Sequence, residues 1–366
     1  MKRYLLLENG SRFEGEGFGA ECPKEGVICE VVFTSAMVGF LETLTDKSYF
    51  GQAVIQTFPL IGNYGVNLED AESERTGCCA YIVREYCEHP SNFRSKMTLD
   101  EFLKKNNVPG LCGIDTRALT KTLCNAGTMN GIITDNPDSV DMEKVKAYRV
   151  ENAVKSMTGN SREVPETNKA ASVNGKEYHV VLLDFGVKEN IVRSLAERGC
   201  NVTVVNAYTK PEDILKLNPD GIMLSNGPGD PKENTEIIEN IQKLIQSKIP
   251  LMGICLGHQL LALANGFDTE KLKFGHRGAN QPVKDLFTNK VYISTQNHGY
   301  AVKPSSIDPS KADTFFINVN DNSNEGLKYK KIPAFSVQFH PEACAGPKDT
   351  GYLFDDFVKL MEKKGE

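Results

Sequence analysis

The chain has 366 residues, of which 40% are hydrophobic and 25% charged, and its formal net charge is −6 at pH 7. This composition is that of a globular protein with room for two domains, and the acidic charge gives no electrostatic case for nucleic-acid binding. The apolar runs are shorter than the roughly 18 residues of a membrane span, and the start of the chain is too weakly apolar for a signal peptide. We therefore expect a cytoplasmic protein that binds neither nucleic acid nor membrane.

The first 150 residues predict a β-rich α/β domain. Short runs of β-type residues, bounded by glycine-rich turns, predict strands within residues 4–19, 25–37, 52–65 and 77–87. A helix is predicted over residues 98–107, where Thr98 and Glu101 have the spacing of a capping box. A second helix is predicted over residues 115–126, because a glycine follows it.

The second half of the chain has a different pattern. Residues 151–177 are polar and aperiodic, which predicts a linker. From residue 178, apolar strand-type runs alternate with amphipathic helical segments as far as residue 266. Alternation of this kind predicts a doubly wound, mostly parallel sheet. The predicted fold class is therefore α/β, with an N-terminal β-rich domain over residues 1–150 and a C-terminal doubly wound domain over residues 178–366.

Ten cysteines are scattered along the chain, without a CxxC pair and without the Cys/His spacing of a zinc site. They fit a reducing compartment, in which most thiols act as small buried apolar side chains. We expect no metal site. Cys255 has a different context, because it lies in the segment GICLG, residues 253–257, where a predicted strand meets a predicted helix.

A residue at a sharp strand-to-helix turn projects from the edge of the sheet, and its neighbours two positions away must be small. This is the form of the G-x-S-x-G nucleophile elbow, with sulfur in place of oxygen. The helix that begins at Cys255 favours a thiolate through its N-terminal dipole, and the N–H of Leu256 is free to face an oxyanion. A buried cysteine at an ordinary strand-to-helix turn would give the same pattern.

A cysteine nucleophile needs a base, and six histidines are available. His258 is three residues after Cys255 on the helix, where a structural role is expected. His340 ends an apolar run in the segment FHPEA, and Glu342 follows two residues later, so that both side chains fall on the same side of an extended chain. Such a carboxylate can fix the imidazole tautomer and stabilise its cation. The pattern predicts a Cys255–His340–Glu342 triad, although a surface turn would also account for the His-Pro-Glu segment alone.

A third stretch, SNGPGDP at residues 225–231, has two glycines and two prolines and predicts a tight loop with exposed backbone amides. It follows another predicted strand, so it reaches the same edge of the sheet as Cys255. It has neither GK[ST] nor GxGxxG and is therefore not a phosphate-binding loop. The loop is either a wall of an active site or a plain connection.

The glycine loop, the cysteine turn and the His-Pro-Glu segment, in this order, resemble the class I (triad) glutamine amidotransferases. Within that class the chain is similar to the family of small, glutaminase subunits of carbamoyl phosphate synthetase. The similar stretches of the second domain are NGPGDP, PLMGICLGHQLLALANG, KFGHRGANQPV, TQNHGYAV and SVQFHPEA. Those of the first domain are FTSAMVGFLETLTDKSYFGQ, TFPLIGNYGVN, PSNFRS and GIDTRALT, and the amidotransferases of GMP and anthranilate synthesis lack this domain.

The resemblance implies that Cys255 attacks the side-chain carboxamide of glutamine. His340 would protonate the leaving ammonia and then activate water, Glu342 would orient His340, and the amides of Leu256 and Gly227 would form an oxyanion hole. The residues implied to contact L-glutamine are Ser48, Gly227, Gly229, Leu256, Gln259, Asn297, Gly299 and Tyr300. Ser48 would place the site in a cleft between the two domains.

The resemblance also implies a partner. The sequence has no phosphate-binding loop, so ATP and Mg²⁺ are expected on a large synthetase subunit, and no cofactor or metal is expected on this chain. That subunit would use two ATP, bicarbonate and tunnelled ammonia to make carbamoyl phosphate for pyrimidine and arginine biosynthesis. We expect a heterodimer, either alone or within a larger assembly, in which residues 1–150 supply much of the docking surface.

The sequence departs from the family pattern in two places. The segment Cys344-Ala345-Gly346-Pro347 replaces a Ser-Pro-Gly-Pro sequence, and Arg277-Gly278-Ala279-Asn280 stands where some members have His-Gly-Gly-Asn.

Three other functions remain as alternatives: an amidotransferase for another acceptor, a hydrolase of γ-glutamyl peptides, and a catalytically silent scaffold subunit. Residues 1–150 argue against the first two, and the intact predicted triad argues against the third.

Overall fold

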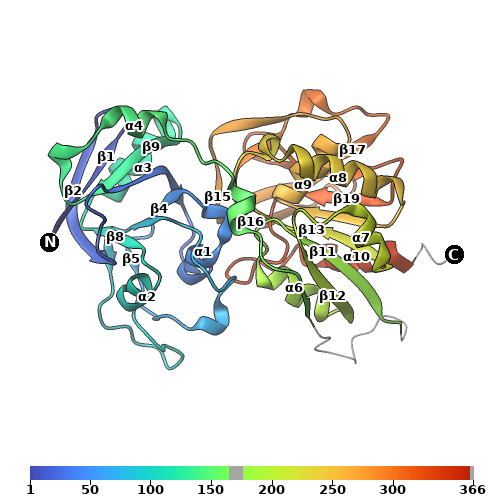
Figure 1. Cartoon of the computed structure of the whole chain (residues 1–366), viewed down its shortest axis with the longest axis horizontal. Helices are drawn as coiled ribbons and strands as arrows, with labels where there is room; N and C mark the ends of the chain where they lie inside the picture. Colours follow the sequence, from blue (N-terminus) through green and yellow to red (C-terminus); the bar gives the residue numbers. More distant parts are fainter. Residues whose placement is uncertain (165–175, 363–366) are drawn as a thin grey trace. The chain divides into compact units, whose positions relative to one another are not determined.

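The computed structural model describes residues 1–164 and 176–362 (Figure 1). The chain folds as two compact units, Met1–Glu151 and Asn152–Glu366. Part of the predicted linker, residues 151–177, belongs to the second unit, where it forms α5 (Ala153–Met157) and β10 (Arg162–Val164). The part of that prediction from residue 165 to residue 175 lies outside the described residues.

The first unit contains a closed barrel of strands in the order β1-β2-β8-β6-β4-β3-β9. Its strands are β1 (Lys2–Leu7), β2 (Arg12–Gly19), β3 (Val27–Thr34), β4 (Gln52–Gln56), β6 (Ala80–Ile82), β8 (Pro109–Cys112) and β9 (Met129–Thr134). A separate pair is formed by β5 (Leu60–Ile61) and β7 (Glu85–Tyr86). The helices are α1 (Phe40–Thr45), α2 (Leu99–Lys105), α3 (Thr116–Ala126) and α4 (Met142–Ala147). The prediction of a β-rich first domain is thereby confirmed.

Local sequence explains where these elements form. In β1, Leu5 and Leu7 alternate with partly exposed residues and are fully buried, as expected for a strand with one face toward a core. Helix α2 begins at the predicted capping box, in which the Glu101 N–H donates to Thr98 Oγ1 and the Thr98 N–H donates to the Glu101 carboxylate. Two orphan amide groups at the start of the helix are thus satisfied.

The second unit is built on a ten-stranded sheet in the order β10-β12-β11-β13-β14-β19-β18-β17-β15-β16, over the residues that the structure describes. The strands after β10 are β11 (Tyr178–Asp184), β12 (Cys200–Asn206), β13 (Gly221–Leu224), β14 (Leu251–Ile254), β15 (Thr269–Asp285), β16 (Val291–Val302), β17 (Ala312–Asn318), β18 (Asn324–Tyr329) and β19 (Ala334–Val337). Strands β12, β11, β13, β14 and β19 are parallel, as predicted. The part from β18 to β16 is antiparallel, because these strands are joined without intervening α-helices.

Helices cover both faces of the parallel part, which confirms the doubly wound prediction. On one face pack α7 (Pro211–Lys216), α8 (Thr235–Gln246) and α9 (Leu256–Ala264), and on the other pack α6 (Glu189–Ala196) and α10 (Tyr352–Glu362). The stripe of Ile237, Ile241 and Leu244 on α8 is fully buried, as the helical period of these residues requires. The carboxyl ends of β13, β14 and β19 consequently meet at one edge of the sheet.

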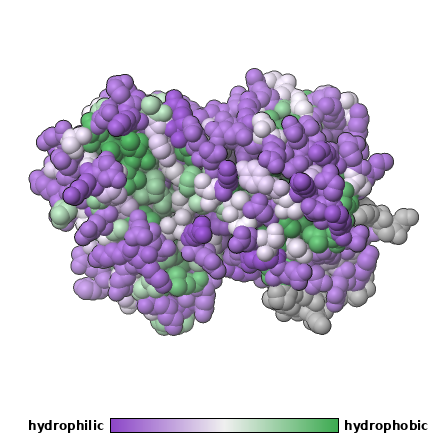
Figure 2. All heavy atoms as spheres, in the orientation of Figure 1, coloured by the Kyte–Doolittle hydropathy of each residue, from purple (hydrophilic) through white to green (hydrophobic). Residues whose placement is uncertain are grey.

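The interiors of the two units are packed with apolar side chains, whereas the face drawn in Figure 2 is largely polar. On the face drawn in Figure 2 most residues are hydrophilic, with a few apolar patches. In the part of the chain that the structure describes, none of the helices has both the length and the apolar character needed to span a bilayer.

Candidate active site

Cys255 lies at the turn between β14 and α9 and has a strained backbone, with φ of 53° and ψ of −105°. A non-glycine residue with positive φ is held there only by its surroundings. Two glycines make the turn possible. A Cβ at Gly257 would be 2.2 Å from the Leu224 carbonyl oxygen of β13, and a Cβ at Gly253 would be 2.7 Å from the Gly257 carbonyl oxygen. The elbow form that the sequence predicted is therefore present.

The turn sets up a hydrogen-bond donor next to the thiol. Leu256 is the first residue of α9, where the N–H of a helix has no acceptor within the helix. The next amide, that of Gly257, donates to the Ser225 carbonyl at 3.0 Å, which fixes the start of α9 against the loop after β13. The Cys255 thiol, 3% exposed, donates to the Asn297 carbonyl oxygen at an Sγ–O distance of 3.7 Å.

His340 and Glu342 follow β19, the strand beside β14. The Cys255 N–H donates to the Val337 carbonyl of β19 at 2.9 Å, and the His340 N–H donates to the Thr295 carbonyl of β16, also at 2.9 Å. His340 Nδ1 and Glu342 Oε1 are 2.7 Å apart, and both side chains are buried. His340 Nε2 is buried without a hydrogen-bond partner, and Cys255 lies close enough for its charge to raise the pKa of His340. The structure thus brings the three residues of the predicted triad together.

The sequence analysis did not single out Lys188, which lies beside this pair. Its ammonium nitrogen is 3.4 Å from His340 Nδ1 and 3.7 Å from Glu342 Oε1, and the residue is 7% exposed. The backbone N–H of Lys188 donates to Asn226 Oδ1 at 3.1 Å, which ties it to the glycine loop. Its position shortly after the buried strand β11, at the carboxyl edge of the sheet, is the signal that could have found it.

The charges at this site raise the pKa of His340. Burial and the Lys188 ammonium lower it, but the charges of Glu342 and Cys255 outweigh both and raise the pKa of His340 to about 10. Burial raises the pKa of Glu342, whereas His340 and Lys188 lower it, and the net direction is down. Together these shifts favour an imidazolium held between a carboxylate and the sulfur of Cys255.

The raised pKa of His340 predicts a dependence of stability on pH. Because the folded pKa, about 10, lies above the ordinary value of 6.5, the folded state binds more protons than the unfolded state between these pH values. This contribution is therefore complete below pH 6.5 and is lost as the pH rises through 10. We expect the unfolding free energy of the wild type to fall with pH in this window, by an amount on the order of a few kcal/mol.

The measurement is urea unfolding at several pH values between 6.5 and 10, for the wild type and for His340→Gln. The slope assigned to His340 should disappear in that variant. His89→Gln, which changes an exposed histidine of the first unit, should keep the wild-type slope. Equal slopes for the wild type and His340→Gln would contradict the prediction.

The loop at residues 225–231 packs against the segment that follows β11. The Phe185 N–H donates to Ser225 Oγ at 2.9 Å, and Asn226 Nδ2 donates to the Gly186 carbonyl at 3.1 Å. A Cβ at Gly227 would be 2.5 Å from the Phe185 carbonyl oxygen, so only glycine allows this approach. Gly229 has a φ of +89°, a conformation that favours glycine. The loop therefore has a fixed conformation at the edge of the sheet that carries Cys255.

Three predicted glutamine contacts lie together on β16: Asn297, Gly299 and Tyr300. A fourth, Gln259 of α9, donates from Nε2 to the Tyr300 carbonyl at 2.7 Å and to Gln338 Oε1 at 2.8 Å. Its amide nitrogen thus has structural partners, which fix α9 to β16 beside Cys255. Two of these residues are tied to the elbow: Asn297, whose carbonyl accepts the Cys255 thiol, and Gln259, on the helix that begins there.

Ser48, the remaining predicted contact, belongs to the first unit, where it lies in a short 3₁₀ helix, Lys47–Tyr49. Its N–H donates to Asp46 Oδ1 at 2.9 Å, so it also has a local structural role. The glutamine contact of Ser48 stays a prediction.

His258, for which a structural role was expected, is fully buried on α9. Its Nδ1 is 2.8 Å from Ser336 Oγ, and burial lowers the pKa of His258 to about 3. It is therefore a neutral ring that links α9 to β19.

Of the two departures from the family pattern, Cys344 is exposed, and Arg277 is buried and donates to the Phe274 carbonyl at 2.7 Å.

A cysteine elbow and a His–Glu pair at the ends of adjacent parallel strands define a class I glutamine amidotransferase, and residues 181–360 match the family model "Glutamine amidotransferase class-I". Residues 5–133 match "Carbamoyl-phosphate synthase small chain, CPSase domain". The chain is 50% identical to the carbamoyl phosphate synthase small chain of Clostridium perfringens, over 98% of this chain and 99% of the relative. It is 49% identical to that of Bacillus cereus, over 100% of this chain and 98% of the relative. The chain belongs to the carbamoyl phosphate synthase small chain family.

A solved structure of a glutamine amidotransferase from Thermotoga maritima is 23% identical, with a TM-score of 0.37, and the match covers 51% of this chain and 85% of the other.

Family membership gives the function in outline: the chain is a glutamine amidotransferase that supplies ammonia for carbamoyl phosphate synthesis. Its family needs no cofactor of its own, and a small chain implies a large-subunit partner.

Proposed function

We propose that Cys255, His340 and Glu342 hydrolyse L-glutamine to glutamate through a thioester on Cys255. The observation that carries this proposal is the buried, hydrogen-bonded His340–Glu342 pair beside a cysteine on a strained elbow. The sulfur attacks the carboxamide carbon, and the N–H of Leu256, with that of Gly227, receives the oxyanion. The imidazolium of His340 gives its proton to the leaving nitrogen, so that ammonia departs.

The second half of the reaction uses the same groups. The neutral His340 takes a proton from water, whose oxygen attacks the thioester carbon. The carbon–sulfur bond breaks, glutamate is released, and the proton returns the imidazolium beside Cys255. Glu342 holds Nδ1 protonated in both halves, which leaves Nε2 for the reacting atoms. Ser48, Gly227, Gly229, Leu256, Gln259, Asn297, Gly299 and Tyr300 are the proposed glutamine contacts.

We further propose a large synthetase subunit as the partner. The large synthetase subunit would bind ATP and Mg²⁺, and would combine the ammonia with bicarbonate for pyrimidine and arginine biosynthesis in the cytoplasm. The two chains would form a heterodimer, alone or within a higher assembly. The first unit is proposed as the main docking surface.

The test is carbamoyl phosphate formation from bicarbonate and MgATP, with this chain mixed with the large subunit of the same source. We expect the wild-type chain to support synthesis from glutamine, Cys255→Ser to fail with glutamine, and both mixtures to work with free ammonia. Synthesis from glutamine by Cys255→Ser would overturn the assignment of the nucleophile. Glutamine hydrolysis without carbamoyl phosphate would show that the acceptor is wrong.

A further inference from the structure

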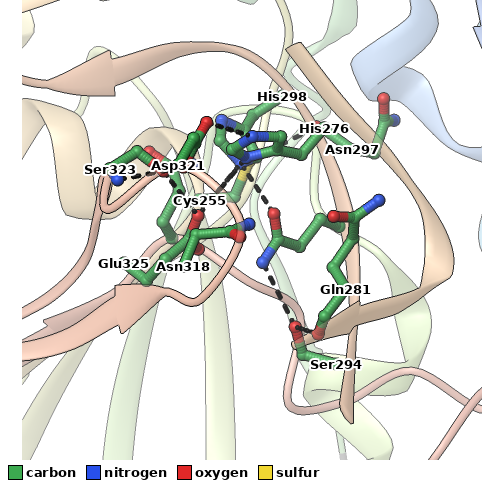
Figure 3. A network of polar contacts seen from close by, with 12 residues as sticks. Cys255, His276, Gln281, Ser294, Asn297, His298, Asn318, Asp321, Ser323 and Glu325 are labelled. Atoms are coloured by element: carbon green, nitrogen blue, oxygen red, sulfur yellow. Dashed lines mark hydrogen bonds and ion pairs between the residues drawn. The ribbon is translucent and has the colours of Figure 1, made fainter. Parts of the chain in front are cut away.

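Three side chains that the proposed reaction does not use converge between the strands of the antiparallel part of the sheet (Figure 3). His276 of β15 and His298 of β16 are directly opposite in the strand register, and Glu325 of β18 faces both. His276 Nδ1 and His298 Nε2 are 3.2 Å apart, and Glu325 Oε1 is 3.4 Å from the first and 3.8 Å from the second. The exposed fractions of His276, His298 and Glu325 are 9%, 4% and 0%.

The outer hydrogen bonds of the two rings fix what faces the centre. His298 Nδ1 is 2.8 Å from the Tyr300 carbonyl oxygen, which can only accept, so Nδ1 carries the proton and Nε2 of the neutral ring has a lone pair. Gln296 Oε1, another acceptor, is 3.1 Å from this Nε2, because the Gln296 amide nitrogen donates to Ser294 Oγ. His276 Nε2 donates to Asp321 Oδ2 at 2.9 Å, which leaves Nδ1 of the neutral ring with a lone pair. Two imidazole lone pairs and a carboxylate oxygen thus meet, and such a group of acceptors requires a cation.

The spacing of these atoms fits a particular cation. Zn²⁺ binds nitrogen and oxygen ligands at about 2.0–2.2 Å in tetrahedral sites, so neighbouring ligand atoms are about 3.3–3.6 Å apart by that geometry. The measured separations of 3.2, 3.4 and 3.8 Å lie close to this range. Imidazole nitrogens with one carboxylate also suit zinc rather than Mg²⁺ or Ca²⁺, which take oxygen ligands.

We propose that His276, His298 and Glu325 form a Zn²⁺ site, with Gln296 Oε1, 3.1 Å from His298 Nε2, as a neighbouring oxygen that could complete it. Asp321 would orient His276 and the Tyr300 carbonyl would orient His298, the arrangement that outer carboxylates and carbonyls have around zinc-bound histidines. Asp321 itself is fixed, because Ser323 donates to Oδ1 from its N–H at 3.0 Å and from its hydroxyl at 2.8 Å. The Asp321 side chain is 44% exposed, so the His276 end of the site lies near the surface.

The sequence did not predict this site, because its ligands come from three strands and have none of the spacings of a zinc motif. His298 is next to Asn297, whose carbonyl accepts the Cys255 thiol. A bound ion would hold β16 rigid at this point, beside the nucleophile; a consequence for glutamine hydrolysis, unlike the binding itself, rests on the proposed function.

The test is a Co²⁺ titration of the chelator-treated full-length chain, since four-coordinate Co²⁺ absorbs strongly in the visible and Zn²⁺ displaces it. We expect one equivalent in the wild type and at least a tenfold loss of affinity in Glu325→Gln and His276→Asn. Asp321→Asn, at a partly exposed position, should keep the spectrum and weaken binding about tenfold. The readout does not involve glutamine, so it is independent of whether the chain hydrolyses it.

Control variants distinguish this site from other histidine or cysteine side chains that could bind Co²⁺. His89→Asn, at an exposed histidine, and Cys255→Ser should bind Co²⁺ like the wild type, and circular dichroism should confirm that each variant is folded. Absence of stoichiometric four-coordinate Co²⁺ in the wild type would overturn the proposal, because a proton on His276 would then be the only cation. Binding that survives Glu325→Gln unchanged, or that is lost in Cys255→Ser, would overturn it as well.

Discussion

Replacing Gly257 with alanine is expected to lower the rate of glutamine hydrolysis at least about 100-fold, although the new methyl group touches no substrate. Its Cβ would lie 2.2 Å from the Leu224 carbonyl oxygen, and a backbone atom of β13 cannot rotate away as a side chain can. Either β13 or the start of α9 must move, and α9 carries Cys255. A displacement of about 1 Å at a nucleophile costs on the order of 100-fold in rate, and such overpacking destabilises a core by about 1–3 kcal/mol.

The measurement is the rate of glutamine hydrolysis, together with the midpoint of urea unfolding. Gly266→Ala is the matched control, because Gly266 ends the same helix region and has a φ of +85°, while its Cβ would meet no atom closer than Lys311 Nζ at 3.5 Å. That variant should lose some stability from backbone strain and keep its rate. Near-wild-type hydrolysis by Gly257→Ala would show that the elbow has more room than its geometry indicates.

The elbow was predictable because its constraints are local. A cysteine between glycines at a strand-to-helix junction defines its own backbone, and the capping box of Thr98 and Glu101 likewise needs only four consecutive residues. The proximity of Cys255 and His340 could be predicted for a related reason. Both follow apolar runs, and parallel strands align their carboxyl ends whatever the sequence distance between them.

Other features depend on partners that no local pattern records. The apolar run before Lys188 places it at the carboxyl edge of the sheet, but its burial beside His340 arises only because β11 and β19 end at the same edge. The His276–His298 pair requires the register of two antiparallel strands, which hairpin geometry and packing set. The antiparallel part of the sheet was missed for the same reason, since its strands lack the regular alternation with helices that marks the parallel part.

Glu342→Gln is expected to reduce the rate of glutamine hydrolysis by about 10³–10⁴-fold while leaving the shape of the site intact. A glutamine amide can donate to Nδ1 of His340, which would then carry its proton on Nε2 and could not act as a base toward Cys255 or water. The same exchange at the acid of a serine-protease triad lowers the rate about 10⁴-fold through the wrong tautomer. Carbamoyl phosphate synthesis from free ammonia by the reconstituted complex should be unchanged.

Stability and catalysis can be separated at this position, because Lys188 faces the same carboxylate at 3.7 Å. Removing one partner of a buried ion pair typically costs about 3–5 kcal/mol, so Glu342→Gln should also lower the urea midpoint. Adding Lys188→Met removes the remaining charge and should recover much of the stability without recovering the rate. If the double variant regained glutamine hydrolysis, the loss in Glu342→Gln would come from misfolding around Lys188, and the role given to Glu342 in orienting His340 would be wrong.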